Sequence, residues 1–170
     1  MDFKRASALL TLAFAACAGG RQDFRPLKAG DVAPAYSSVT LKGDTVDLAR
    51  LQGRAVLFNV WATWCIPCRE EMPAIEQLHA VYADSGLAVV AVSVDEAGTD
   101  RDVGSFVETY GVHFTIARDP AKRVQRVFRT IGVPETFLLD RHGKIVRRWI
   151  GQFEPMSADS KKAVQEALRG

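Results

Sequence analysis

Two cysteines, Cys65 and Cys68, lie two residues apart near the middle of the 170-residue chain. They follow the apolar run Ala55–Trp61, which predicts a buried parallel strand. Residues 67–84 come next and predict a helix. Its apolar face comprises Met72, Ile75, Leu78 and Tyr82. This order constrains the fold, because a strand must lead directly into a helix with a dithiol at its amino end.

The rest of the chain alternates strand-like and helix-like segments. The expected elements are a hairpin over 35–51 with its turn at 42–44, strands over 87–94, 113–116, 136–140 and 144–150, and helices over 100–110, 120–130 and about 156–168. Asp119 is expected to cap the helix over 120–130, and Gly86 to close the helix after the cysteines. This pattern predicts an α/β domain with a central mixed β-sheet flanked by helices.

Composition and charge limit the functions that the chain can have. Apolar residues make up 48% and charged residues 25%, which is ordinary for one globular domain of this length. The net charge is only +2, and the Lys and Arg residues are dispersed along the chain. We therefore expect no nucleic-acid partner, since such proteins carry a concentrated basic surface.

The first residues resemble an export signal. Lys4 and Arg5 precede the uncharged stretch 6–16, which is too short to span a bilayer comfortably. Residues 14–17 resemble a lipoprotein processing site at which Cys17 would be lipidated, although ordinary cleavage nearby also fits the small residues there. The predicted organisation is therefore a signal over 1–17, a tether over 18–28 and a domain over 29–170. The expected location is the periplasm or the outer face of a bacterial membrane.

Export gives the two central cysteines a chemical meaning. If Cys17 is lipidated, Cys65 and Cys68 are the remaining pair, and outside the cytoplasm they would be oxidised to each other. In the reduced state, the helix amino end would stabilise a thiolate on Cys65. Pro67 suits this first helical turn because its missing N–H has no partner there. The sequence thus predicts thiol–disulfide exchange in which Cys65 attacks and Cys68 resolves.

A structural metal site is the main competing interpretation of two such cysteines. Zinc would need two more ligands at usable spacing. The chain offers only three histidines, which are His79, His113 and His142. We therefore expect no metal and no cofactor beyond the redox-active disulfide.

Two motifs carry a family resemblance. Residues 61–73 (WATWCIPCREEMP) and 132–140 (GVPETFLLD) resemble the TlpA/ResA branch of exported thioredoxin-like proteins. The resemblance covers about residues 29–170 and implies a thioredoxin fold. It also implies an N-terminal β-hairpin and an inserted helix–strand pair, which correspond to 35–51 and 100–116 here.

The resemblance also assigns a proton-handling residue. Thioredoxins carry a buried Asp in the strand before the dithiol, whereas this chain has Asn59, which cannot act as a base. Glu71 resembles the acidic residue that the TlpA/ResA branch places three residues after the second cysteine. We expect Glu71 to accept the proton of Cys68. The alternative is that Glu71 is a solvated acid beside Glu70.

Further residues are expected to form the substrate-binding surface around the dithiol. They are Trp64, Ile66, Pro67, Val133 and Pro134. Trp64 is expected at the rim and Trp61 in the core, and the resemblance implies a cis Val133–Pro134 bond facing the dithiol. An apolar rim of this kind suits an extended peptide segment.

The resemblance favours a reductase of protein disulfides, with a role like cytochrome c maturation. Its partners would be protein disulfide substrates, a membrane-embedded thiol–disulfide shuttle as electron donor, and the membrane surface through the lipid. Two alternatives are a thiol peroxidase and a copper-binding metallochaperone. Peroxidases of the neighbouring family use a P-x-x-x-T/S-x-x-C run, which does not precede Cys65. Copper chaperones on this fold space their cysteines by three residues and supply a distal His, and nothing specifies His113 for that role.

Overall fold

The computed structural model describes residues 25–170. The strands are β1 (Ser37–Thr40), β2 (Thr45–Asp47), β3 (Ala55–Trp61), β4 (Leu87–Ser93), β5 (Thr115–Arg118), β6 (Glu135–Leu139) and β7 (Ile145–Ile150). The helices are α1 (Ile66–Tyr82), α2 (Asp100–Thr109), α3 (Arg123–Phe128) and α4 (Ala158–Arg169), with a 3-10 turn, η1, at Leu48–Leu51.

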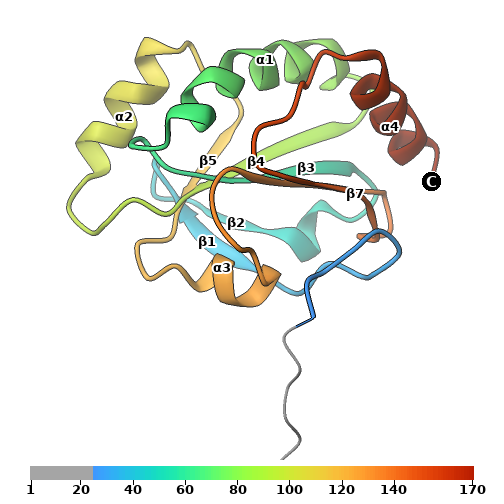
Figure 1. Ribbon diagram of the computed structural model, residues 1–170, viewed down its shortest axis with the longest axis horizontal. Coiled ribbons are helices and arrows are strands. Elements are labelled where there is room, and N and C mark those ends of the chain that lie inside the picture. Colours follow the sequence, from blue (N-terminus) through green and yellow to red (C-terminus); the bar gives the residue numbers. More distant parts are fainter. Residues whose placement is uncertain (1–24) are drawn as a thin grey trace, which may run out of the picture.

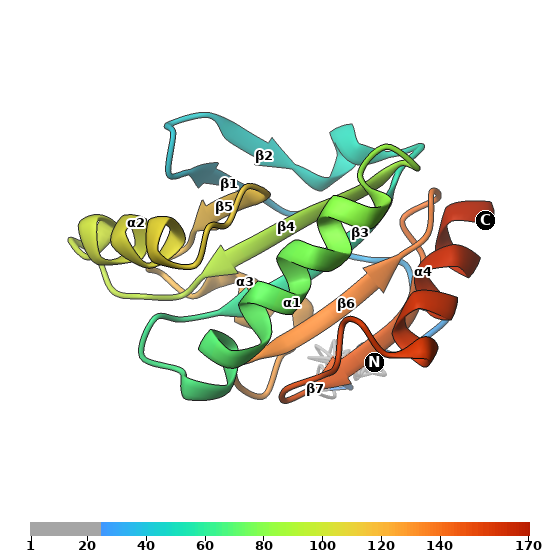
Figure 2. The same ribbon diagram turned by 90° about the horizontal axis from the view of Figure 1, so that it is seen from above.

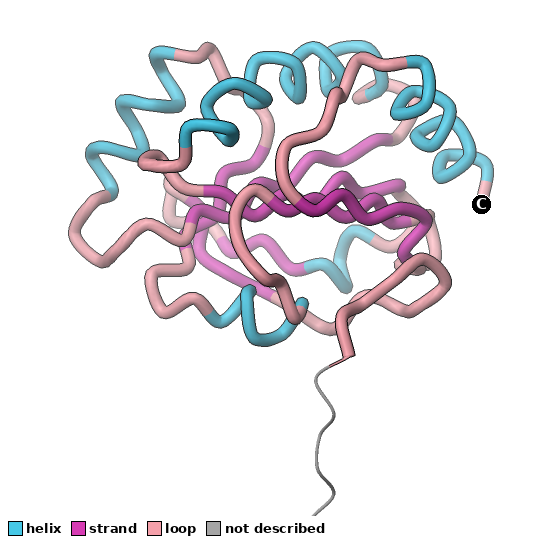
Figure 3. The backbone as a smooth tube through the Cα atoms, viewed as in Figure 1, coloured by secondary structure: helices cyan, strands magenta, loops and turns pink. Residues whose placement is uncertain are grey.

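The strands form one seven-stranded mixed sheet in the order β2-β1-β5-β4-β3-β6-β7. β3 lies inside the sheet, parallel to β4 and antiparallel to β6. Helices α1, α2 and α4 lie on one side of the sheet and α3 on the other (Figure 1), and α1 runs across β3 and β4 when seen from above (Figure 2). The three layers are visible in the backbone tube (Figure 3). The predicted mixed sheet flanked by helices is confirmed.

The strands beside the dithiol follow from the sequence pattern. Every residue of β3 and β4 is buried, as expected for strands covered on both faces. The apolar face predicted for α1 is also confirmed, since its four members are all buried. Helix α1 continues through Pro73, and it ends at Tyr82, before Gly86. Gly86 takes a left-handed φ of 101° in the turn that follows.

The predicted hairpin and inserted pair are both present. β1 and β2 are antiparallel, and Gly43 adopts a left-handed φ of 89° in their turn. The pair α2 and β5 corresponds to the predicted segment 100–116, with β5 parallel to β4. β1 then pairs with β5, which joins the hairpin to the main sheet.

Helix α3 is shorter than predicted, and the prediction that Asp119 is its N-cap residue is wrong. It begins at Arg123 after Lys122, which has a left-handed φ of 54°, instead of at residue 120 after Asp119. The main-chain N–H of Asp119 donates to the carbonyl of Ser93, so the chain remains bound to the sheet edge at this point. The carboxylate of Asp119 nevertheless accepts from the N–H of Val124 at 2.6 Å. Asp119 therefore caps the helix from a greater distance in sequence.

The signal over 1–17, including Cys17, lies outside the described residues. Of the predicted tether, residues 25–28 are described, and they lie against the domain. The carbonyl of Arg25 accepts from Arg129 Nη1 at 2.9 Å, and the carbonyl of Leu27 accepts from Arg148 Nη1 at 2.6 Å. No helix within residues 25–170 is long and apolar enough to cross a membrane.

Candidate active site

Cys65 and Cys68 are joined in a disulfide, with their Cα atoms 5.3 Å apart. Cys65 is the N-cap of α1, and its Sγ accepts a hydrogen bond from the N–H of Cys68 at 3.3 Å. Pro67 lies in the first helical turn, as predicted. Cys65 is 5% exposed and Cys68 is fully buried. A partner sulfur can therefore reach only Cys65, and main-chain donors at the helix start stabilise its thiolate.

Asp95 holds the loop that leads to Cys65. Its carboxylate accepts from the N–H of Thr63 at 3.1 Å and from the Thr63 hydroxyl at 2.6 Å. It also accepts from the Ser93 hydroxyl at 2.7 Å. Asp95 is 3% exposed and was not among the predicted site residues. A sequence signal for Asp95 did exist: it is an acidic residue shortly after the apolar strand β4. β4 pairs with β3, the strand that leads into the dithiol.

The segment before β6 forms the opposite wall of the site. The Val133–Pro134 peptide bond is cis, as the resemblance implied. Pro134 is buried and Val133 is half-buried. Because β6 is antiparallel to β3, with Glu135 opposite Val60, this segment lies at the end of the sheet where β3 leads into the dithiol loop.

Glu71 is buried behind the dithiol, one helical turn after Cys68. It is 2% exposed, which excludes a solvated acid on the helix face. Its Oε1 accepts from Asn59 Nδ2 at 3.0 Å, and its Oε2 accepts from the N–H of Phe153 at 3.3 Å. Burial raises the pKa of Glu71 to about 7, against a smaller opposing effect of these two donors. The pKa of this carboxyl group thus suits proton transfer near neutral pH.

The raised pKa of Glu71 predicts a pH-dependent stability. The folded chain binds the carboxyl proton more tightly than the unfolded chain, whose Glu71 has the ordinary pKa near 4.5. The free energy of unfolding should therefore fall as pH rises from about 4.5 to 7, by roughly 2–3 kcal/mol, and stay level above that range. Urea unfolding of the oxidised protein at pH 5 and pH 8 measures this difference. Glu71→Gln should remove most of it, and an equal pH dependence in the variant would contradict the assignment.

Exposed apolar side chains flank Cys65 in the chain and also lie near the cis proline. Trp64 is 64% exposed and Ile66 67%, whereas Trp61 is fully buried, as expected for a rim and a core tryptophan. Two further exposed residues, Ile131 and Ile150, lie near the cis proline and were missed from the sequence. Ile131 comes shortly before the cis bond, and Ile150 pairs across the sheet with the first residue of β6. Isolated apolar residues in loops and edge strands have no sequence periodicity that could have identified them.

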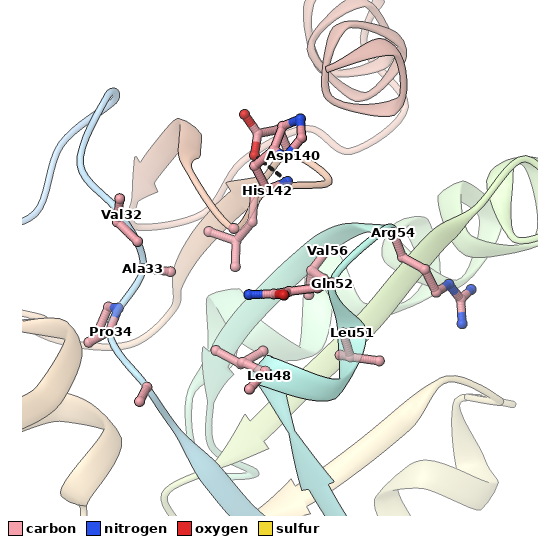
Figure 4. A pocket seen from close by; sticks show the side chains of 14 residues that line it. Val32, Ala33, Pro34, Leu48, Leu51, Gln52, Arg54, Val56, Asp140 and His142 are labelled. Atoms are coloured by element: carbon pink, nitrogen blue, oxygen red, sulfur yellow. Dashed lines mark hydrogen bonds between the residues drawn. The ribbon is translucent and has the colours of Figure 1, made fainter.

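A small hollow at the other end of the sheet is separate from this site. A cavity of about 180 Å³ lies between the segment 32–35, η1 and the β6–β7 turn, and it contains none of the predicted site residues (Figure 4). Asp140 Oδ1 accepts from the N–H of His142 at its edge. Within residues 25–170, no group of three or more His, Cys, Asp or Glu residues is placed to hold a metal ion.

Comparison with known proteins identifies the family. Residues 29–148 match the AhpC/TSA family. The chain belongs to that family. The thiol-disulfide oxidoreductase ResA of Bacillus thuringiensis (strain Al Hakam) is 35% identical over 130 residues, which are 76% of this chain and 74% of ResA. The thioredoxin-like protein YneN of Bacillus subtilis (strain 168) is 38% identical over 136 residues, which are 79% of each chain.

Solved structures agree with this assignment. A Chlorobium tepidum protein described as the thiol:disulfide interchange protein DsbE superimposes with a TM-score of 0.76 at 34% identity, covering 84% of this chain and 99% of that one. The thioredoxin domain of a Bacteroides vulgatus thiol-disulfide oxidoreductase gives 0.72 at 28% identity, with 84% and 99% coverage. The predicted thioredoxin fold is confirmed. With its Cys65–Cys68 disulfide, the chain is a thiol–disulfide oxidoreductase of the ResA type.

Proposed function

We propose that this oxidoreductase reduces protein disulfides in the bacterial cell envelope. The observation that carries the proposal is the burial pattern of the dithiol: Cys65 reaches the surface at a helix start, and Cys68 is enclosed beside a buried acid. A structural disulfide would need no such acid, since its sulfurs do not exchange protons. The expected role in apocytochrome c reduction remains part of this proposal.

The reaction proceeds through a mixed disulfide. The Cys65 thiolate attacks one sulfur of the substrate disulfide, and the other substrate sulfur leaves as a thiolate. Cys68 then gives its proton to Glu71 and attacks Sγ of Cys65. The Cys65–Cys68 disulfide forms, and the second substrate sulfur leaves. Two electrons pass from the dithiol to the substrate, and a membrane-embedded thiol–disulfide shuttle is the proposed donor that restores them.

We propose attachment to the outer face of a membrane through a lipid on Cys17. The sequence pattern at 14–17 supports this, and so does the position of residues 25–28, which lead from the predicted tether onto the domain. The reaction needs no cofactor besides the disulfide, because both electrons and the relayed proton are held by side chains of the chain itself. Relatives named as thiol-disulfide oxidoreductases favour exchange over peroxide reduction or copper transfer.

The reduction potential of the Cys65–Cys68 couple tests the direction of the reaction. We expect a value near that of thioredoxin, about −270 mV, as measured by equilibration with glutathione or dithiothreitol buffers. A value near −120 mV, which is typical of strong periplasmic oxidants, would contradict a reductase. A peroxide consumption assay and a copper titration of the reduced protein test the two alternatives.

Substrate docking should depend on the exposed apolar rim. Trp64→Ala removes a large exposed ring beside Cys65, so we expect kcat/KM for a protein disulfide to fall about tenfold, which corresponds to 1–2 kcal/mol of lost contact. The rate with a small aromatic disulfide should change little. Val81→Ala, on an exposed face of α1 remote from the cysteines, is the matched control. Equal losses with both substrates would indicate a distorted site instead of a docking surface.

A further inference from the structure

One buried polar atom behind the dithiol lacks a hydrogen-bond partner. Asn59, in the middle of β3, is fully buried. Its Nδ2 donates both to Glu71 Oε1 at 3.0 Å and to Thr136 Oγ1 at 2.8 Å. Its carbonyl atom Oδ1 is also buried but accepts no hydrogen bond. A buried unsatisfied carbonyl is unfavourable, so this arrangement needs an explanation.

The two neighbours of Asn59 differ in what they can do. The Glu71 carboxylate only accepts hydrogen bonds, but the protonated acid must also donate one. The Thr136 hydroxyl can do either. Rotating the Asn59 amide by half a turn exchanges Oδ1 and Nδ2. In that orientation, Oδ1 can accept from both protonated Glu71 and the Thr136 hydroxyl.

The position of the proton on Glu71 follows from its other contact. Oε2 accepts from the main-chain N–H of Phe153, a donor that cannot rotate. The proton is therefore expected on Oε1, which faces Asn59. On Oε1, the proton would point at the Nδ2 hydrogens of Asn59 and be repelled by them unless the amide turned.

The groups that hydrogen-bond to Glu71 are neutral. On the same helix, Cys68 precedes Glu71 by one turn, and the nearer titratable neighbours, Arg69 and Glu70, are both exposed. β3 contributes Asn59, and the connector between β7 and α4 contributes the Phe153 main chain. β6 contributes Thr136, which bonds to Asn59. None of these contacts is a charged group that could compensate a change of charge on Glu71. The rotatable amide dipole of Asn59 is therefore the element that can adapt.

We propose that Asn59 is a positioning residue whose side-chain amide turns over when Glu71 gains or loses its proton. One orientation donates to the carboxylate, and the other accepts from the acid. Asn59 thus supports Glu71 in both of the charge states that the proposed relay requires. Only the use of this amide rotation during turnover rests on the proposed function.

NMR of the oxidised full-length protein tests the proposal, because Cys65 and Cys68 do not titrate while they form the disulfide. The Glu71 carboxyl carbon and the Asn59 side-chain amide are followed from pH 5 to 9. We expect both to change with one midpoint near pH 7, and both Nδ2 protons to lose their hydrogen-bonded shifts as Glu71 becomes protonated. An Asn59 amide that stays unchanged through the Glu71 midpoint would overturn the proposal. The absence of any Glu71 titration would overturn it as well.

Two variants locate the coupling. Glu71→Gln should make the Asn59 amide signals independent of pH, whereas Thr136→Val should leave them linked to Glu71. If the Asn59 amide signals no longer followed the titration of Glu71 in Thr136→Val, a switch driven by Glu71 would be contradicted. If Glu71→Gln resolves mixed disulfides at the unmodified rate while the Asn59 amide still follows Glu71 in the unmodified chain, the relay fails and the switch stands.

Asn59→Asp tests the proposal through the pH profile of the resolving step, which a merely structural role of Asn59 would leave unchanged. Two adjacent buried carboxyl groups retain one shared proton, so Glu71 would not be free to accept another near neutral pH. We expect the pH profile of the resolving step to move upward by at least one unit. An unchanged profile in a folded variant would contradict the proposal. If the variant does not fold, the NMR titration of the unmodified chain still decides.

Discussion

Cys68→Ala should convert the protein from a catalyst into a trap. Cys65 keeps its place at the start of α1 and still attacks substrate disulfides, but no second sulfur can release the product. We expect loss of essentially all turnover and accumulation of covalent adducts on Cys65. Non-reducing gel electrophoresis of cell-envelope extracts, followed by mass spectrometry of the linked peptides, measures both effects.

The matched controls are Cys65→Ala and the double variant that lacks both cysteines. In Cys65→Ala the sulfur of Cys68 is fully buried, so we expect few adducts on it despite an intact thiol. The double variant should form none. Adducts of equal abundance in Cys65→Ala and Cys68→Ala would show that the two sulfurs are equally accessible, and the assigned roles of attacking and resolving cysteine would be wrong.

The strand–dithiol–helix unit could be predicted from sequence because each part has its own local signal. The apolar run of β3, the proline in the first turn and the apolar face of α1 agree with one another. The start of α3 could not be predicted, since Asp119 is held by the sheet and caps from five residues away. Local capping rules consider neighbours in sequence, whereas this contact is set by tertiary structure.

The dithiol and Glu71 could be named from the sequence, but the partners of Glu71 could not. Asn59 was identified only as a residue that lacks the acid of thioredoxins. Its contacts with Glu71 and Thr136 join α1, β3 and β6, and the N–H of Phe153 comes from a loop 82 residues away. A main-chain donor has no residue signature, so only the folded chain reveals it. The depth of burial that raises the pKa of Glu71 is likewise a property of the assembled layers.

Glu71→Gln should slow the resolving step by about 1,000-fold at pH 7, which lies within the usual range for loss of a general base. Glutamine preserves the shape of the buried side chain but cannot accept the proton of Cys68. In the unmodified chain the step should accelerate as pH rises through about 7, because Glu71 then becomes a free carboxylate. In the variant this rise should move toward the ordinary thiol pKa of about 8.5, so that the ratio of the two rates narrows as pH rises.

Stopped-flow reaction of the reduced protein with a symmetric chromogenic disulfide separates the two steps. The first released thiol reports attack by Cys65, and the second reports resolution by Cys68. Glu70→Gln is the matched control, since Glu70 is the exposed neighbour on the same helix and loses the same charge. We expect only Glu71→Gln to slow the second phase, with the first phase little changed in both variants. Equal slowing of the second phase in both would assign the effect to net charge near the dithiol, and the buried position of Glu71 would then have no part in moving the proton.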